Sequence, residues 1–261
     1  MKQDRRRFLK GLTAVSAAGG VPAGLIPAEA QAQHATHLAQ ARPAGALATQ
    51  LQAYTYFTQP EVLFVEAAVA RLIPADELGP GAKEAGVAYF IDQQLFGEWG
   101  AMGRNYRQGP WGEGTPQQGY QSPLTPKEVY RAGIRETNLY CEKRYGKTFD
   151  ALSSSEQDEV LRGLDEGKIE LATAPARLFF NLLLGNTIEG FFADPMYGGN
   201  RDKVGWKLVG FPGVAAVYTA FTEQHGVPYP AQPVSIVDIQ QNLAQLDEHG
   251  HPQHVLTARK E

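Results

Sequence analysis

Cysteine is almost absent from this sequence, which contains Cys141 and no second thiol in its 261 residues. An internal disulfide is therefore excluded, and so is a Cys-x-x-Cys-His site for covalent haem attachment. The sequence also lacks a GxGxxG turn opening a strand–helix unit, the usual dinucleotide-binding pattern. Cys141 lies in a predicted helix, where a single thiol is typical of a small buried apolar side chain.

Positive charge is not in excess, because 24 Lys and Arg residues face 28 Asp and Glu residues and the formal net charge is −4. This mild acidity argues against binding to nucleic acid or to an anionic membrane surface. Hydrophobic residues make up 43% of the chain, which is enough for a core. The 28 glycines and 17 prolines predict long ordered loops.

The N-terminus has the three parts of an export signal. Its basic part matches the key positions of the twin-arginine address: Arg5, Arg6, Phe8, Leu9 and Lys10. Asp4 stands where that address usually has Ser or Thr, residues 11–28 are uncharged, and small-x-small cleavage sites end at Ala30 and Ala32. A transmembrane anchor is the alternative, but glycines and prolines dilute the apolar stretch. We therefore predict a twin-arginine signal over residues 1–32.

Recurrent helix-start signals predict an all-α fold. Thr58, Thr125 and Ser153 each begin a capping box, in which a hydroxyl and a Glu three residues later satisfy exposed backbone amides. Apolar residues at helical spacing extend these starts. The predicted helices cover residues 59–72, 82–96, 126–145, 154–166, 175–192 with Thr173 as its cap, 214–225, and 235–246, where 234–238 can instead form a short strand.

Long Gly- and Pro-rich segments join these helices, so we expect an irregular helical domain with long ordered loops over residues 58–248. Residues 33–57 are predicted to be a linker or an extended N-terminal arm, and residues 249–261 a flexible tail. The longest loop, residues 97–123, contains Trp99 and Trp111. A loop of this length in a domain is usually functional or disordered, and its aromatic residues favour packing against a partner or ligand.

The most distinctive segment is 194–213, Asp-Pro-Met-Tyr-Gly-Gly-Asn-Arg-Asp-Lys-Val-Gly-Trp-Lys-Leu-Val-Gly-Phe-Pro-Gly. Its Asp-Pro pair ends the preceding helix, and its Gly-Gly-Asn string permits left-handed backbone and the close approach of another chain. A helix rather than a strand precedes it, which argues against a phosphate-binding loop. Our candidates for a partner interface are Trp99, Trp111, Asp194, Pro195, Tyr197, Gly198, Gly199, Asn200, Trp206 and Phe211.

These strings carry a resemblance to a known family. Residues 191–200, Phe-Phe-Ala-Asp-Pro-Met-Tyr-Gly-Gly-Asn, with Gly205-Trp-Lys-Leu and Gly210-Phe-Pro-Gly, resemble the signature of the gluconate 2-dehydrogenase subunit 3 family. Leu72-Ile-Pro-Ala-Asp and Gly79-Pro-Gly-Ala also resemble that family. The similarity extends from about Val62 to about Pro230, and the Asp-Pro-x-Tyr-Gly-Gly-Asn string is its specific part.

The resemblance implies a complex of three subunits. A large flavoprotein subunit binds FAD and oxidises a sugar or sugar acid, and a c-type cytochrome subunit carries haem c. The small subunit has no cofactor and no catalytic residue, and it stabilises the flavoprotein and escorts it through the twin-arginine translocase. The resemblance thus implies a location at the periplasmic face of the inner membrane.

Two other functions remain open from the sequence. The loops at 97–123 and 194–213 are also compatible with a stand-alone periplasmic enzyme or small-molecule-binding protein. His249, His251 and His254 have short spacing, which is compatible with a metal site as well as with a solvated tail. Glu170 and Glu189 lie in apolar surroundings and are further candidates for contact with a partner, and neither has a recognisable base or nucleophile beside it.

Overall fold

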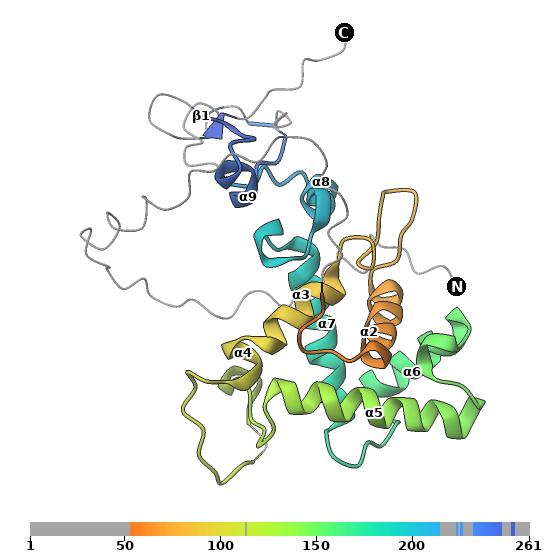
Figure 1. The fold of residues 1–261 in the computed structure, drawn as a ribbon. Helices are drawn as coiled ribbons and strands as arrows, with labels where there is room; N and C mark the ends of the chain where they lie inside the picture. Colours follow the sequence, from red (N-terminus) through yellow and green to blue (C-terminus); the bar gives the residue numbers. More distant parts are fainter. Residues whose placement is uncertain are drawn as a thin grey trace. The chain divides into compact units, whose positions relative to one another are not determined.

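The computed structural model describes residues 53–112, 114–214, 223, 225–226, 232–246 and 252–253 (Figure 1). The predicted all-α fold is confirmed over these residues. The α-helices are α2 (Gln59–Leu72), α3 (Val87–Phe96), α4 (Glu98–Ala101), α5 (Pro126–Tyr145), α6 (Ser154–Asp165), α7 (Ala176–Phe192), α8 (Val204–Val209) and α9 (Ile236–Gln240). The 3-10 helices are η2 (Pro116–Gln118), η3 (Phe149–Ala151), η4 (Pro195–Tyr197) and η5 (Arg201–Lys203). Strands β1 (Gln245–Leu246) and β2 (Pro252–Gln253) form a short antiparallel pair.

The chain divides into two compact units. The larger one contains residues 54–113 and 120–261 and holds every described element except η2. The smaller one contains residues 1–53 and 114–119. Its described part includes η2, where the Thr115 amide donates to the Gln118 side chain at 2.7 Å.

The three capping boxes form at the predicted positions. The backbone amides of Thr58, Thr125 and Ser153 donate to the Glu three residues later at 2.8, 2.7 and 2.8 Å. Hydrogen bonds from the cap residues lower the pKa of Glu128 and of Glu156. Helix starts encoded in four consecutive residues were therefore predictable, because both partners of the box are local.

Several predicted boundaries were wrong. Helix α3 begins at Val87 rather than at residue 82, because Gly86 has left-handed backbone with a φ of 76°. Thr173 does not cap α7, since its amide donates to the Glu136 carboxylate at 3.0 Å and Pro175 precedes the helix. Helix α9 ends at Gln240 instead of continuing to residue 246. The helix predicted for 214–225 lies mostly outside the described residues.

Helix α7 is the centre of the larger unit, and α2, α3, α5 and α6 all pack against it (Figure 1). It is apolar over most of its circumference, which is the pattern of a helix surrounded by others. Its Phe179 ring is fully buried and lies edge-on to the Tyr130 ring of α5, with centroids 5.7 Å apart. Phe64 of α2 packs on Phe179 at 6.1 Å and on Phe149 of η3 at 4.6 Å, so aromatic contacts join α2, α5, α7 and η3 in one core.

The crossing of α5 and α7 is close because α5 has a glycine at the contact. A Cβ atom on Gly133 would lie 2.4 Å from the Phe179 ring, well inside van der Waals distance. Gly185 of α7 is different, since no atom lies within 4 Å of a Cβ placed there. The buried Cys141 on α5 confirms the predicted buried thiol, and burial raises its pKa to about 12.

These two glycines provide a matched test of the core. We expect Gly133→Ala to lower the free energy of unfolding by about 1–3 kcal/mol, because the added methyl group displaces the Phe179 ring. Gly185→Ala should raise it by up to about 1 kcal/mol, because alanine favours the helix and finds open space. Urea unfolding of both variants checks the prediction, and a stabilising Gly133→Ala would contradict the close contact between Gly133 and the Phe179 ring.

Candidate partner-binding surface

The distinctive segment begins with Asp194, which terminates α7 and organises two later elements. Its Oδ1 atom accepts the Met196 amide at 2.9 Å and thereby starts η4. Its Oδ2 atom accepts the Ile236 amide at 2.9 Å and thereby holds the first turn of α9. One carboxylate thus joins two parts of the chain that are 42 residues apart.

Asn200 fastens the same segment to the end of α7. Its side chain is fully buried, and its Nδ2 atom donates to the Ala193 carbonyl at 2.8 Å. Its Oδ1 atom accepts the Gly205 amide at 2.8 Å. Its backbone φ is +45°, in the left-handed region that Asn tolerates better than most residues. The predicted left-handed backbone is therefore present, and the amide side chain serves to join the segment to the helix.

The close approach predicted at the glycines is made by this chain's own helices. A Cβ atom on Gly199 would lie 2.2 Å from the Gly190 carbonyl oxygen, and one on Gly205 would lie 2.0 Å from that of Phe191. Gly198, with a φ of 92°, lies against the Tyr89 ring of α3. These glycines thus allow the segment to lie directly on α3 and α7, and partner contact at their positions stays a prediction.

Trp206 is also used within the chain, whereas Phe211 is not buried. The Trp206 indole donates to the Phe192 carbonyl at 2.7 Å, and its side chain is only 5% exposed. Phe211 packs edge-on against it at 5.1 Å but keeps 46% of its surface exposed. Three neighbours in the segment are similarly exposed apolar side chains: Met196, Tyr197 and Val209. A rigid segment that presents several such side chains is typical of a protein-binding surface.

An open groove lies between α3 and the end of α7. It is lined mainly by apolar atoms, and the aromatic side chains are Phe90, Phe192 and Tyr197. Gln94, Glu189 and Asp194 also line it. No Lys or Arg is among its lining residues, so the described lining is acidic as well as aromatic.

The other two candidate residues lie between α3 and α5, where helix α4 occupies residues 98–101 of the predicted loop 97–123. Trp99 is on α4 with 40% of its surface exposed, and Trp111 is 39% exposed. The Arg107 guanidinium lies 5.4 Å from the Trp111 ring centroid, and it donates to the Ser122 carbonyl at 3.1 Å. The loop thus has internal contacts, and both tryptophans remain candidates for partner contact.

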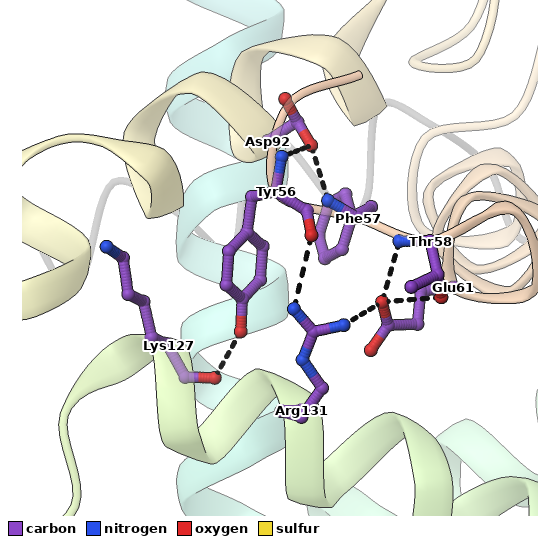
Figure 2. Close-up of polar contacts among 7 residues, drawn as sticks. All are labelled: Tyr56, Phe57, Thr58, Glu61, Asp92, Lys127 and Arg131. Atoms are coloured by element: carbon purple, nitrogen blue, oxygen red, sulfur yellow. Dashed lines mark hydrogen bonds and ion pairs between the residues drawn. The ribbon is translucent and has the colours of Figure 1, made fainter.

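The end of the N-terminal arm is joined to the helical unit by a buried carboxylate that the sequence analysis missed. Asp92 of α3 is fully buried, and three consecutive arm amides donate to it; Figure 2 shows those of Tyr56 and Phe57. Thr55 donates to its Oδ2 atom at 2.8 Å, while Tyr56 and Phe57 donate to its Oδ1 atom at 2.9 and 2.8 Å. The sequence does contain one sign of this buried carboxylate, because Asp92 is the single charged residue in the stretch 87–96.

Arg131 of α5 holds the same arm from the other side (Figure 2). Its guanidinium donates to the Tyr56 carbonyl at 3.1 Å and forms an ion pair with Glu61 of α2. It also lies over the Tyr56 ring, 4.4 Å from the centroid, and the Tyr56 hydroxyl donates to the Lys127 carbonyl at 2.7 Å. We call residues 54–57, Asp92 and Arg131 the arm clasp.

The arm clasp is continuous with the distinctive segment through two tyrosines. The Tyr54 hydroxyl donates to the Glu66 carboxylate at 3.2 Å, and its ring lies edge-on to Tyr89 at 6.2 Å. Tyr89 in turn lies against Gly198. The arm end and the segment are therefore supported by the same helix, α3.

Asp92→Asn tests the arm clasp. The new amide group replaces one carboxylate oxygen, so at least one arm amide faces a donor instead of an acceptor. We expect a loss of about 3 kcal/mol in the free energy of unfolding, and faster hydrogen exchange at the amides of residues 55–57. The matched control is Asp165→Asn, on an exposed residue at the end of α6, which should change stability by less than about 0.5 kcal/mol. Equal stability of the two variants would contradict this role for Asp92.

A second ion pair holds α9 against η5. Lys203 donates to the Asp238 Oδ2 atom at 2.7 Å, and the Ser235 amide donates to the same atom at 2.7 Å. Burial raises the pKa of Asp238, but the hydrogen bonds from Lys203 and Ser235 outweigh it and the net pKa is lowered.

This lowered pKa gives a pH-dependent contribution to stability. A carboxylate with a lower pKa in the folded state stabilises it above the unfolded pKa of about 4, and the contribution is lost as the pH falls through the folded value. We expect Asp238→Asn to be less stable than the wild type at pH 7 and the difference to narrow below about pH 4. Urea unfolding at a series of pH values measures this, and a constant difference would contradict it.

Comparison with known proteins decides the family. A model of the gluconate 2-dehydrogenase subunit 3 family matches residues 59–213, which is more than half of the chain. The chain belongs to the gluconate 2-dehydrogenase subunit 3 family. The matched region of this subunit 3 chain begins at the first residue of α2 and ends with the distinctive segment. No curated protein and no solved structure gives a significant match to it.

The family name implies association with the other subunits of a dehydrogenase complex. Within the described residues, no helix has the length and apolarity needed to cross a membrane. Nor do these residues contain a group of three or more His, Cys, Asp or Glu side chains able to hold a metal ion. The twin-arginine residues 5–10 and the histidines at 249, 251 and 254 lie outside the described residues.

Proposed function

We propose that this subunit 3 chain is the non-catalytic small subunit of an FAD-dependent dehydrogenase complex of the gluconate 2-dehydrogenase type. It stabilises the flavoprotein subunit and escorts it through the twin-arginine translocase. The observation that carries the proposal is the family match over residues 59–213, which ends in a segment that is rigidly held and yet exposes apolar side chains.

The physical logic of escort begins with the cofactor. FAD is bound in a folded pocket, so the flavoprotein folds and loads its cofactor before it leaves the cytoplasm. A folded protein requires a route that accepts folded cargo, and one export address serves two proteins that remain bound during transit. Such a complex needs a large interface, on the order of 2,000 Å² or more. The exposed segment and the tryptophan-containing loop supply apolar area of the required kind.

The arm clasp supports the same proposal from the other end of the chain. The predicted leader at residues 1–32 is connected to the domain through residues 54–57, and these are held by Asp92 and Arg131. The leader is therefore attached to a part of the chain that is itself held on the folded unit. In the proposed complex, a c-type cytochrome subunit with haem c completes the assembly at the periplasmic face of the inner membrane.

The escort function is tested by changing the export address while leaving the folded domain intact. We expect Arg5→Lys with Arg6→Lys to retain the flavoprotein in the cytoplasm, soluble and loaded with FAD, because the address is recognised by residue identity. Fractionation and dehydrogenase activity of each compartment measure this. The matched control is Arg7→Lys, at the variable position of the address, which should leave export unchanged. Active flavoprotein in the periplasm of the double variant would refute the escort function.

A further inference from the structure

The groove between α3 and α7 contains a carboxylate whose position is fixed by a buried relay. Tyr130 is fully buried, and its hydroxyl donates to the Asn186 Oδ1 atom at 2.8 Å. The Asn186 Nδ2 atom then donates to the Glu189 Oε2 atom at 2.9 Å. Burial raises the pKa of Tyr130, so its hydroxyl stays protonated and remains a donor. The hydrogen bonds of the relay therefore all point from the Tyr130 hydroxyl through Asn186 to Glu189, and the last of them orients the Glu189 carboxylate.

The second oxygen of this carboxylate is available to a ligand. Among the described residues, none donates a hydrogen bond to the Glu189 Oε1 atom and no Lys or Arg forms an ion pair with Glu189. Asp194, the other acid in the groove, already uses both oxygens for the amides of Met196 and Ile236. Of the two acidic residues that line the groove, Glu189 is thus the one with a carboxylate oxygen that accepts no described hydrogen bond.

The charge and the shape of the groove indicate what it binds. The groove lining contains two acidic residues and no Lys or Arg. This negative charge disfavours the binding of an anionic sugar acid and favours that of a cation. Phe90, Phe192 and Tyr197 add aromatic surface, on which a planar guanidinium stacks while it donates to a carboxylate. An arginine side chain combines both properties, and arginine is enriched among the residues that dominate protein interfaces.

We infer that the groove receives an arginine side chain of the flavoprotein subunit, with Glu189 as its carboxylate partner. This inference rests on the proposed function, because it names the chemistry by which the same surface binds that subunit. The hydrogen bond from Asn186 restricts the Glu189 side chain, and this restriction reduces the entropy lost on binding. The aromatic side chains of the groove lie beside the ion pair, and a bound partner that covers the groove would reduce the screening of this pair by water and salt.

Glu189→Gln is the decisive variant, because it removes the charge but keeps an oxygen that accepts from Asn186. The matched control is Glu142→Gln, on an exposed carboxylate in the last turn of α5 and outside the groove lining. Both variants are mixed with the purified FAD-loaded flavoprotein subunit, and the dissociation constant is measured at several salt concentrations. We expect Glu189→Gln to weaken binding at least about tenfold and to reduce its salt dependence, while Glu142→Gln matches the wild type.

The outcomes separate the two proposals. If the wild type binds the flavoprotein and Glu189→Gln binds equally well with the same salt dependence, the arginine site is refuted while the subunit role stands. If the wild type itself does not bind, the proposed function fails and the arginine site fails with it. The thermal midpoint of the free Glu189→Gln variant should equal that of the wild type, which shows that weaker binding does not arise from misfolding.

Discussion

The fully buried carboxylate of Asp92 is the constraint around which the N-terminal side of the domain is arranged. A buried charge is tolerated only when hydrogen-bond donors surround it, and here three consecutive amides of residues 55–57 provide them. The arm end must therefore lie on α3 for the helical unit to be stable. Arg131 then fixes the same arm to α2 and α5 through Glu61 and the Tyr56 carbonyl.

The end of α7 sets a second requirement, because the last carbonyl groups of a helix have no partner within it. The indole of Trp206 satisfies the Phe192 carbonyl, and the amide of Asn200 satisfies that of Ala193. Gly199 and Gly205 let the segment come close enough for these contacts. Much of the string that identifies the family is thus explained by capping one buried helix. In the proposed complex, the side chains of the string that remain exposed, such as Tyr197 and Phe211, are the ones free to contact a partner.

Features encoded in neighbouring residues were predictable from the sequence, and those that join distant residues were not. The capping box from Thr58 to Glu61 specifies a helix start within four residues, and the structure contains this capping box. In the arm clasp, Asp92 meets residues 35 to 37 positions away and Arg131 meets Tyr56, 75 positions away. The relay from Tyr130 to Asn186 joins residues 56 positions apart. Apolar spacing predicts that a helix buries one face, but it does not specify which polar group meets another across the fold.

The position of α3 relates the arm to the groove. Phe90 and Gln94 are one turn apart and line the groove, whereas Tyr89 and Asp92 contact the arm end. Residues spaced by three or four share a face of a helix, so these two pairs lie on different faces of α3. A partner seated in the groove therefore does not occupy the face that holds residues 54–57. In the proposed complex, α3 supports the bound subunit on one face and the attachment of the export leader on another.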